Sequence, residues 1–273
     1  MSNEVQGAQS FARSIGVLQR IADAGDPLSR AELVRQCELT RPTLYRIIAS
    51  LEAEGLIEAT RDNRYRLGGR LVNLARTALH QNDVRKIAAP VLSQLRDATG
   101  ETVHLAIPSG DELVYIDKIE SHQAVRMASS IGTRVPMHST SVGKAYLSAL
   151  PVAEANALID RLPLPAITRY TTTDPGKLKK SVTKARKQGY VRDDQENETG
   201  IVCFGAAIRE DFDRPVASLS VSIPLFRVGE AARYSQPLIE AVASISRQLG
   251  YVEASGSRPE KATQTVSPKR TGR

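Results

Sequence analysis

The sequence has little cysteine, no long hydrophobic run and no lysine among its first 85 residues. Its two cysteines, Cys37 and Cys203, lie far apart, without the paired spacing of a disulfide framework or a zinc site. No stretch of about 18 uncharged apolar residues is present to span a membrane, and the N-terminus lacks the pattern of a secretory signal. These absences predict a soluble, cytoplasmic protein in a reducing compartment, with no metal and no cofactor.

The positive charge of the chain is unevenly distributed. The formal net charge is +7, yet residues 1–85 carry 12 arginines against 10 acidic residues, while residues 255–273 carry 5 basic residues against 1 acid. More than half of the excess lies in that C-terminal segment, which has almost nothing to bury and is predicted to be a disordered basic tail. The net charge alone is therefore a weak argument for nucleic-acid binding. Seven arginines against four acids within residues 41–76 are a stronger one.

Residues 40–51 contain the motif around which the N-terminal half is organised. Thr40 can cap a helix, and Pro42 is tolerated in its first turn. An apolar stripe at the spacing i, i+3, i+4 and i+7 comprises Leu44, Ile47, Ile48 and Leu51. The outward residues are rich in donors suited to phosphates and base edges, namely Arg41, Thr43, Tyr45, Arg46 and Ser50. This pattern is typical of a DNA-recognition helix.

The flanking sequence predicts the rest of a DNA-binding unit. A helix is expected over about residues 12–24, and a capping box formed by Ser29 and Glu32 starts a second helix before a tight turn. A short helix, a turn and a second helix form the helix-turn-helix pattern. Residues 56–67 then predict a β-hairpin wing in which Arg64 and Arg66 alternate with apolar residues. We expect both arginines to point away from the core, toward phosphates or the minor groove.

The C-terminal half mixes strands and helices. Helical spacing over residues 71–79 predicts a linker helix, and a further helix over about 84–98 contains Pro90. The other expected elements are a hairpin at 103–116, a turn at 132–136, a capped helix at 139–147, helices near 152–162 and 177–188, strands at 201–208 and 216–223, and a last helix over 229–249. This order predicts an α+β domain around a largely antiparallel sheet.

Six stretches with their order and spacing carry a resemblance to a known family. They are 28–33 (LSRAEL), 65–68 (YRLG), 100–105 (GETVHL), 136–145 (PMHSTSVGKA), 189–194 (GYVRDD) and 200–203 (GIVC). On these residues the chain resembles the IclR family of bacterial transcription regulators over residues 10–250. The turn before the recognition helix departs from the family pattern, because it reads Glu38-Leu39 where Gly-Leu is usual.

The resemblance implies a fold and a mode of assembly. It implies an N-terminal winged helix-turn-helix domain over 10–69, a linker helix over 70–83 and a C-terminal effector-binding domain of GAF-like α/β fold over 84–254. The tail at 255–273 lies beyond the resemblance. It also implies homodimers, often dimers of dimers (tetramers), that bind palindromic or repeated operator half-sites in double-stranded DNA.

Two sets of candidate binding residues follow. The DNA-binding set is Arg41, Thr43, Tyr45 and Arg46 from the helix with Arg64 and Arg66 from the wing. The alternatives are an ordinary amphipathic surface helix and, for Tyr45, a packing role. The second set follows from the resemblance, because family members that bind small carboxylates use backbone positions matching Ser141 and Val142. The side-chain positions matching theirs are Asp193, Cys203, Ser220 and Ser222.

Local chemistry supports an anion site near Ser141, although each residue also has a simpler explanation. Ser139, Thr140 and Ser141 precede a helix, so hydroxyls and free backbone N–H groups converge at a partial positive charge. Alternatively, Ser141 is only a helix cap, Cys203 a buried apolar residue and Asp193 a solvated loop carboxylate. His138 is expected to be structural.

These observations and the resemblance predict a transcriptional regulator, and not an enzyme, that binds DNA and responds to a small organic acid or a related carbonyl metabolite. Repression of a catabolic operon is favoured over activation, because operator occupancy alone can block transcription. An enzyme that uses Cys203 as nucleophile, with His104 or His138 as base, is the alternative from another class. A pure interaction module without a DNA role is the third.

Overall fold

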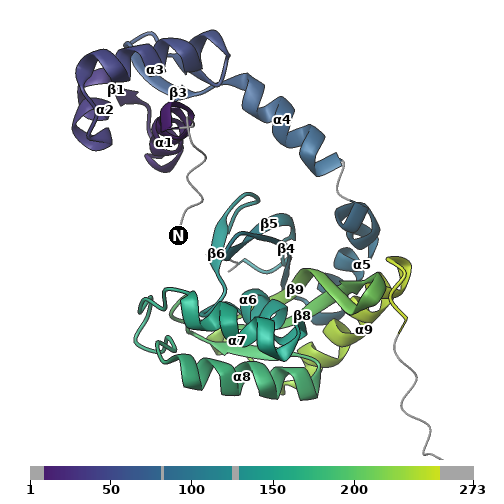
Figure 1. Cartoon of the computed structure of the whole chain (residues 1–273). Helices are drawn as coiled ribbons and strands as arrows, with labels where there is room; N and C mark the ends of the chain where they lie inside the picture. Colours follow the sequence, from purple (N-terminus) through teal and green to yellow (C-terminus); the bar gives the residue numbers. More distant parts are fainter. Residues whose placement is uncertain (1–8, 81–82, 125–128, 253–273) are drawn as a thin grey trace, which may run out of the picture. The chain divides into compact units, whose positions relative to one another are not determined.

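The structure is a computed structural model that describes residues 9–80, 83–124 and 129–252, without the side chains of Leu79, His80 and Phe212. The predicted basic tail at 255–273 and part of the predicted linker, residues 81–82, lie outside these ranges. The chain divides into two compact units, Met1–Asp83 and Val84–Arg273 (Figure 1). Within the described ranges, no helix combines the length and apolar character that crossing a bilayer requires.

The N-terminal unit is a helical core closed by a small sheet. Its elements are α1 (Gln9–Asp23), β1 (Leu28–Ser29), α2 (Arg30–Cys37), α3 (Arg41–Ala53), β2 (Ile57–Ala59), β3 (Arg64–Leu67) and α4 (Gly69–His80). All four residues of the predicted apolar stripe on α3 are buried, which confirms the orientation of that helix. They pack with Val17 and Ile21 of α1, Leu33 of α2 and Tyr65 of β3.

The turn between α2 and α3 has the expected geometry with an unusual residue. The predicted capping box is confirmed, since the Ser29 hydroxyl accepts from the Glu32 N–H at 3.3 Å and Glu32 accepts from the Ser29 N–H at 2.7 Å. Glu38 lies in the left-handed region, with φ 50° and ψ 31°, a conformation that glycine adopts at lower cost. Thr40 occupies the N-cap position of α3, although its hydroxyl meets Thr43 Oγ1 at 2.9 Å instead of a backbone N–H.

A three-stranded sheet with the order β1-β3-β2 closes this unit. The predicted hairpin of β2 and β3 is confirmed, with Ile57 opposite Leu67. The two-residue strand β1 was not predicted. It pairs Leu28 with Tyr65 and Ser29 with Arg64, so the start of the helix-turn-helix is hydrogen-bonded to the wing.

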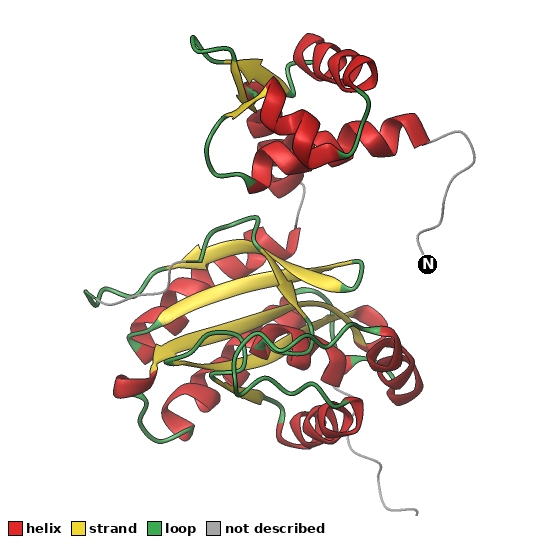
Figure 2. Cartoon of the chain, turned by 90° about the vertical axis from the view of Figure 1, so that its left-hand side faces the viewer, coloured by secondary structure: helices red, strands yellow, loops and turns green. Residues whose placement is uncertain are grey.

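The C-terminal unit is the predicted α+β domain (Figure 2). Its helices are α5 (Asp83–Thr99), α6 (Ser141–Ala149), α7 (Val152–Arg161), α8 (Pro175–Gln188) and α9 (Ala232–Gln248), with short 3-10 helices η1 (Asp211–Asp213) and η2 (Leu225–Arg227). Its strands are β4 (Thr102–Ser109), β5 (Glu112–Ile119), β6 (Arg134–Pro136), β7 (Val191–Asp194), β8 (Ile201–Glu210) and β9 (Arg214–Pro224). They form one antiparallel sheet in the order β6-β5-β4-β9-β8-β7.

Two of these strands correct the sequence-based expectations. Strand β6 occupies most of the segment that was predicted to be a turn. Strand β7 places Asp193 in the sheet, where it is 2% exposed, so the interpretation as a solvated loop carboxylate is wrong. Both strands are short and lie at the two edges of the sheet. Such strands have too few residues to show a clear alternation in sequence.

Helices α6 and α9 cover opposite faces of β8. Phe204 on β8 stacks with Tyr234 of α9 at a ring-centroid distance of 5.5 Å. On the other face, Gly205 allows the start of α6 to approach, because a Cβ at this position would collide with the Ser141 carbonyl and lie 2.9 Å from Ser141 Cβ. The glycine thereby brings the N-terminus of α6 directly against the sheet.

Candidate functional site

The exposed face of α3 carries most of the predicted DNA-binding residues. Arg41, Tyr45 and Arg46 are exposed, and Thr43 is half-buried. Successive residues of a helix are rotated by 100°, so Tyr45 and Arg46 lie on opposite sides of the line that points directly away from the buried stripe of α3. Arg46 borders a polar groove of about 290 Å³ between α1 and α3, to which Arg13 also contributes. Arg13 was not among the residues predicted from the sequence.

Tyr45 combines the two roles that the sequence left open. Its side chain is 47% exposed, yet its ring packs against the guanidinium group of Arg30 at 5.5 Å from the ring centroid. The tyrosine therefore packs on α2 while one side remains available to a partner.

The wing arginines do not behave as expected. Arg64 points back to the helix-turn-helix, where Nη2 lies 2.8 Å from Glu32 Oε2 and Nε donates to the Pro27 carbonyl at 2.7 Å. Arg64 alternates with the buried Tyr65 and lies outside the hydrophobic core, but it is not free for DNA as expected, because pairing of β1 with β3 brings these acceptors beside it. Arg66 is exposed but paired with Glu58, with Nε 2.7 Å from Oε1.

The turn of the wing offers a different arginine. Arg61 is exposed and has no hydrogen-bond or ion-pair partner among the residues that the structure describes. Sequence reasoning passed over it because Arg61 lies in the turn and does not share the alternation of Arg64 and Arg66. A guanidinium at the tip of a wing is better placed for phosphate than one that is held by carboxylates of its own domain.

The pairing of Glu32 has an electrostatic signature. Hydrogen bonds from Ser29, together with the Arg64 guanidinium, lower the pKa of Glu32 to about 2. The carboxylate is therefore ionised at neutral pH, where it holds both the start of α2 and Arg64.

The C-terminal unit contains a polar row across three strands. Asp193 on β7 is the partner of Cys203 on β8, and Cys203 is the partner of Ser222 on β9. Cross-strand partners project to the same face of a sheet. The Cys203 thiol donates to the Ser222 hydroxyl at 3.3 Å, and Asp193 Oδ1 accepts from the Glu196 N–H at 2.8 Å.

This polar row borders a small cavity at the start of α6. The cavity has a volume of about 20 Å³, little more than one water molecule requires. Four of the six predicted effector-binding residues line it: Ser141, Asp193, Cys203 and Ser222. Thr140, which the sequence placed at the same anion site, also lines it, whereas sequence reasoning did not select four further lining residues, which are Tyr115, Asn197, Glu198 and Ile201.

The remaining two predicted residues, Val142 and Ser220, are buried and are not among the residues that line the cavity. Val142 is fully buried, and Ser220 is 1% exposed opposite Gly205 and His104. Ser141 is not the helix cap, because Thr140 occupies that position and its hydroxyl accepts from the Gly143 N–H at 3.1 Å. The Ser141 side chain is therefore not needed for capping.

Among the described residues, the charged side chains that line the cavity are acidic. Asp193 and Glu198 contribute carboxylates, whereas neither lysine nor arginine is among the lining residues. The buried Lys144 on α6 is ion-paired with Glu196. Burial raises the pKa of Asp193 to about 7, although Lys144 and the Glu196 N–H oppose this shift. At neutral pH, Asp193 can consequently act as either a donor or an acceptor.

The environment of Cys203 does not favour a nucleophile. Burial and the nearby Asp193 raise the pKa of its thiol, so the thiolate is disfavoured. His104 Nδ1 lies 3.4 Å from the Ser222 hydroxyl, and burial lowers the pKa of His104 to about 3. His138 Nε2 lies 3.0 Å from the Pro165 carbonyl, which supports its expected structural role.

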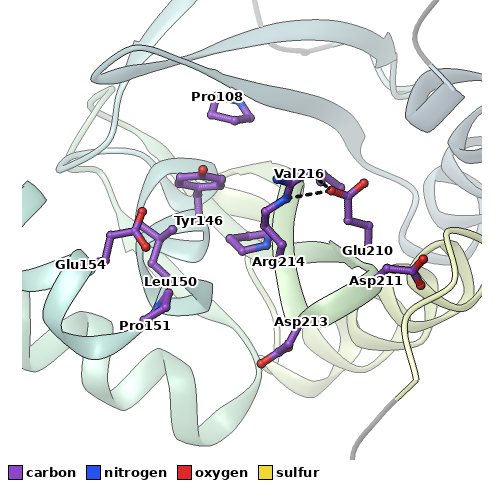
Figure 3. A pocket seen from close by; sticks show the side chains of 11 residues that line it. Pro108, Tyr146, Leu150, Pro151, Glu154, Glu210, Asp211, Asp213, Arg214 and Val216 are labelled. Atoms are coloured by element: carbon purple, nitrogen blue, oxygen red, sulfur yellow. Dashed lines mark hydrogen bonds and ion pairs between the residues drawn. The ribbon is translucent and has the colours of Figure 1, made fainter.

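A much larger cavity lies elsewhere in this unit. It has a volume of about 930 Å³ and is bordered by Tyr146, Glu154, Asp211 and Arg214 (Figure 3). Arg214 Nε donates to Glu210 at 2.9 Å. None of the predicted effector-binding residues lines this cavity, so its size alone does not connect it with the polar row.

Comparison with known proteins covers both units. Residues 10–61 match the family described as "IclR helix-turn-helix domain", and residues 76–249 match "Bacterial transcriptional regulator IclR C-terminal". The chain is 33% identical to the HTH-type transcriptional regulator XynR of Escherichia coli K12, covering 89% of this chain and 98% of that protein. It is 31% identical to the HTH-type transcriptional repressor AllR of the same strain, covering 90% and 92%.

Solved structures agree with these matches. The Thermotoga maritima IclR superposes with a TM-score of 0.72 at 34% identity, over 89% of this chain and 99% of that one. An IclR homolog complexed with 4-hydroxybenzoate, from Microbacterium hydrocarbonoxydans, has a TM-score of 0.75 at 26% identity, over 89% and 99%. The named relatives are regulators and not enzymes, which argues against the alternative based on Cys203.

Proposed function

The chain belongs to the IclR family of bacterial transcriptional regulators, and from this premise we propose that it is a repressor whose operator binding is modulated by a small organic acid or a related carbonyl metabolite. Its relative AllR is named a transcriptional repressor. We further propose that it acts in the cytoplasm on a catabolic operon. Both sets of predicted binding residues belong to this proposal.

The observation that carries the effector proposal is the polar row facing the N-terminus of α6. Free backbone N–H groups at a helix N-terminus favour a carboxylate, here at Ser141 and Val142. The polar row offers Asp193, Cys203 and Ser222 to the other polar group of the ligand. A related regulator was crystallised with 4-hydroxybenzoate, which is itself a carboxylate.

Ligand binding requires the cavity to change. A cavity of about 20 Å³ is too small for an organic acid, so the bound form must differ in the position of α6 or of the segment that carries Asn197 and Glu198. A ligand that prefers the open form shifts the equilibrium by its difference in affinity, on the order of 1–3 kcal/mol. We propose that α4 transmits this preference to the spacing of two recognition helices.

That mechanism requires at least two protomers, and we propose a homodimer that can form a dimer of dimers. Exposed apolar side chains on the N-terminal unit support self-association. Val72 and Leu74 of α4 are 72% and 54% exposed, and Phe11 of α1 is 69% exposed. Val72 and Leu74 project from different sides of α4, so the helix offers exposed apolar surface to another copy of the chain.

Arg46→Ala is expected to weaken specific DNA binding by roughly 1–3 kcal/mol if Arg46 contacts a base, and Arg41→Ala should behave in the same way. The measurement is a gel-shift titration with a duplex that the wild-type protein selects from a random pool, alongside an unselected duplex. Lys184→Ala, an exposed position on α8, is the control and should bind like wild type. Equal wild-type affinity for both duplexes would refute the assignment of α3 as a recognition helix.

Cys203→Ser should leave DNA binding intact and weaken the response to the effector roughly two- to tenfold, as expected for loss of one hydrogen-bonding partner. The test is release from the selected duplex as a panel of small carboxylic acids, including 4-hydroxybenzoate, is titrated. Cys37→Ser is the matched control, because Cys37 lies in the N-terminal unit and should not alter the response. Turnover of one of these acids, abolished by Cys203→Ser, would contradict a purely regulatory role.

A further inference from the structure

Arg30 links three elements of the DNA-binding unit. It is the first residue of α2, and its guanidinium carbon lies 5.5 Å from the ring centroid of Tyr45 on α3 and 5.6 Å from that of Tyr65 on β3. Its Nε also donates to the Tyr65 hydroxyl at 2.7 Å. Contacts with two tyrosine rings, together with the hydrogen bond to one of them, restrict the position of the guanidinium group.

The outer edge of this guanidinium group is left without a partner. Arg30 is exposed, and within the described residues its Nη1 and Nη2 make neither a hydrogen bond nor an ion pair. Guanidinium carries five N–H donors, of which the Tyr65 contact uses one. The two terminal nitrogens can therefore bind an external acceptor without breaking any contact of the folded domain.

Other arginines of the same unit differ in this respect. Arg64, Arg66 and Arg70 are ion-paired with Glu32, Glu58 and Glu54. Their charges are partly neutralised within the domain. Arg30 is held by two tyrosines and forms no ion pair within the described residues, and the Glu52 carboxylate contributes only a minor attraction to its charge.

The position of Arg30 matches the proposed DNA-binding surface. Tyr45, on which it stacks, lies on the exposed side of α3 next to Arg46. A fixed, fork-shaped cation at this place is suited to the two oxygens of a phosphate, which guanidinium binds through parallel hydrogen bonds. Because its side chain is already ordered, it loses less conformational entropy on binding than a free arginine.

We propose that Arg30 is a DNA-backbone contact, held in position by Tyr45 and Tyr65, that binds one phosphate at the edge of the recognition helix. The proposal rests on the proposed DNA-binding surface. Arg30 contributes affinity that is independent of base sequence, in contrast to the base contacts proposed for α3.

The test uses the full-length protein and measures DNA affinity by fluorescence anisotropy between about 50 and 200 mM KCl. The two probes are a duplex selected by the wild-type protein and an unselected duplex of the same length. Arg30→Ala should weaken binding to both probes about three- to tenfold, and should reduce the slope of log affinity against log salt by about 0.9 for each protomer on the DNA. Arg35→Ala, on the same helix but with no contact to either tyrosine, should leave the slope unchanged.

Charge-preserving and neutral replacements separate a phosphate contact from a packing role. Arg30→Lys keeps the charge and loses the stacked plane, so it should retain most of the slope while affinity falls. Arg30→Gln removes the charge from a side chain that still packs, and replaces Arg30→Ala if that variant does not fold. Weaker binding with an unchanged slope in the neutral variants would overturn the proposal. Failure of the wild-type protein to bind either duplex would instead refute DNA binding by this unit.

Discussion

Gly205→Val is expected to destabilise the C-terminal unit by roughly 3–5 kcal/mol. A side chain at this position would collide with the backbone of Ser141, so α6 must move away from the sheet. Relief by a change of rotamer is not available, because the obstructing atoms belong to a backbone. Urea unfolding followed by circular dichroism should show the transition of this unit at lower denaturant concentration. The effector response should be lost as well, since the start of α6 forms one wall of the cavity.

Gly205→Ala should also destabilise the C-terminal unit, by a smaller amount of roughly 1–3 kcal/mol. Gly16→Ala is the control for replacing a glycine, because a Cβ at Gly16 has no neighbour within 4 Å. Its effect should be neutral or stabilising by up to about 1 kcal/mol, since Gly16 lies in a helix. Unchanged stability of Gly205→Val would mean that α6 does not approach β8 as described.

Asp193→Asn is expected to stabilise the protein above pH 7. The folded-state pKa of Asp193 is about 7, against 3.8 for an ordinary aspartate. A group with a raised folded-state pKa contributes stability that is present below its unfolded pKa and is lost as the pH rises through its folded pKa. This difference in pKa means that ionising Asp193 costs roughly 4 kcal/mol more in the folded than in the unfolded protein. Asparagine avoids this penalty and keeps an oxygen acceptor for the Glu196 N–H.

The gain in stability should therefore grow between about pH 4 and pH 7 and stay constant above pH 7. Thermal unfolding of both proteins across this range measures it. Asp194→Asn is the matched control, because the Asp194 side chain, next to Asp193 in sequence, is 52% exposed and paired with Arg192. That variant should change stability little at any pH. An equal gain for Asp193→Asn at pH 5 and pH 8 would contradict a buried carboxyl that titrates near neutrality.

The same group should couple effector binding to pH. An organic acid bound at the start of α6 places a second negative charge near Asp193, which is tolerated only while Asp193 is protonated. Affinity should then fall by up to about tenfold for each pH unit above 7. Asp193→Asn should remove this dependence.

Features that depend on a single helix could be predicted from the local sequence. The stripe from Leu44 to Leu51 and the capping box at Ser29 depend on neighbours within one or two turns, and both were predicted correctly. The ion pair of Arg64 was not predicted, because it depends on the pairing of β3 with a two-residue strand, in which Ser29 lies opposite Arg64 although 35 residues separate them. So short a strand leaves no periodic signal.

Only some of the residues that line the small cavity could be predicted from the sequence. Family resemblance was enough to select Cys203 and Ser222, and the structure pairs them across β8 and β9. Tyr115, Asn197 and Glu198 reach the same cavity from β5 and from the segment between β7 and β8. Nothing in their local sequence marks them, since their role depends on contacts between segments that are distant along the chain.

The pairing of β1 with β3 also affects how the N-terminal unit folds. It joins Leu28 to Tyr65, so the chain that contains the recognition helix is a loop whose ends meet in a sheet. Closing such a loop costs chain entropy before the sheet contacts form, which slows folding relative to a bundle with local contacts only. Helix-turn-helix and wing should consequently fold and unfold as one cooperative unit. Hydrogen exchange should then report similar opening free energies for the amides of α3 and β3.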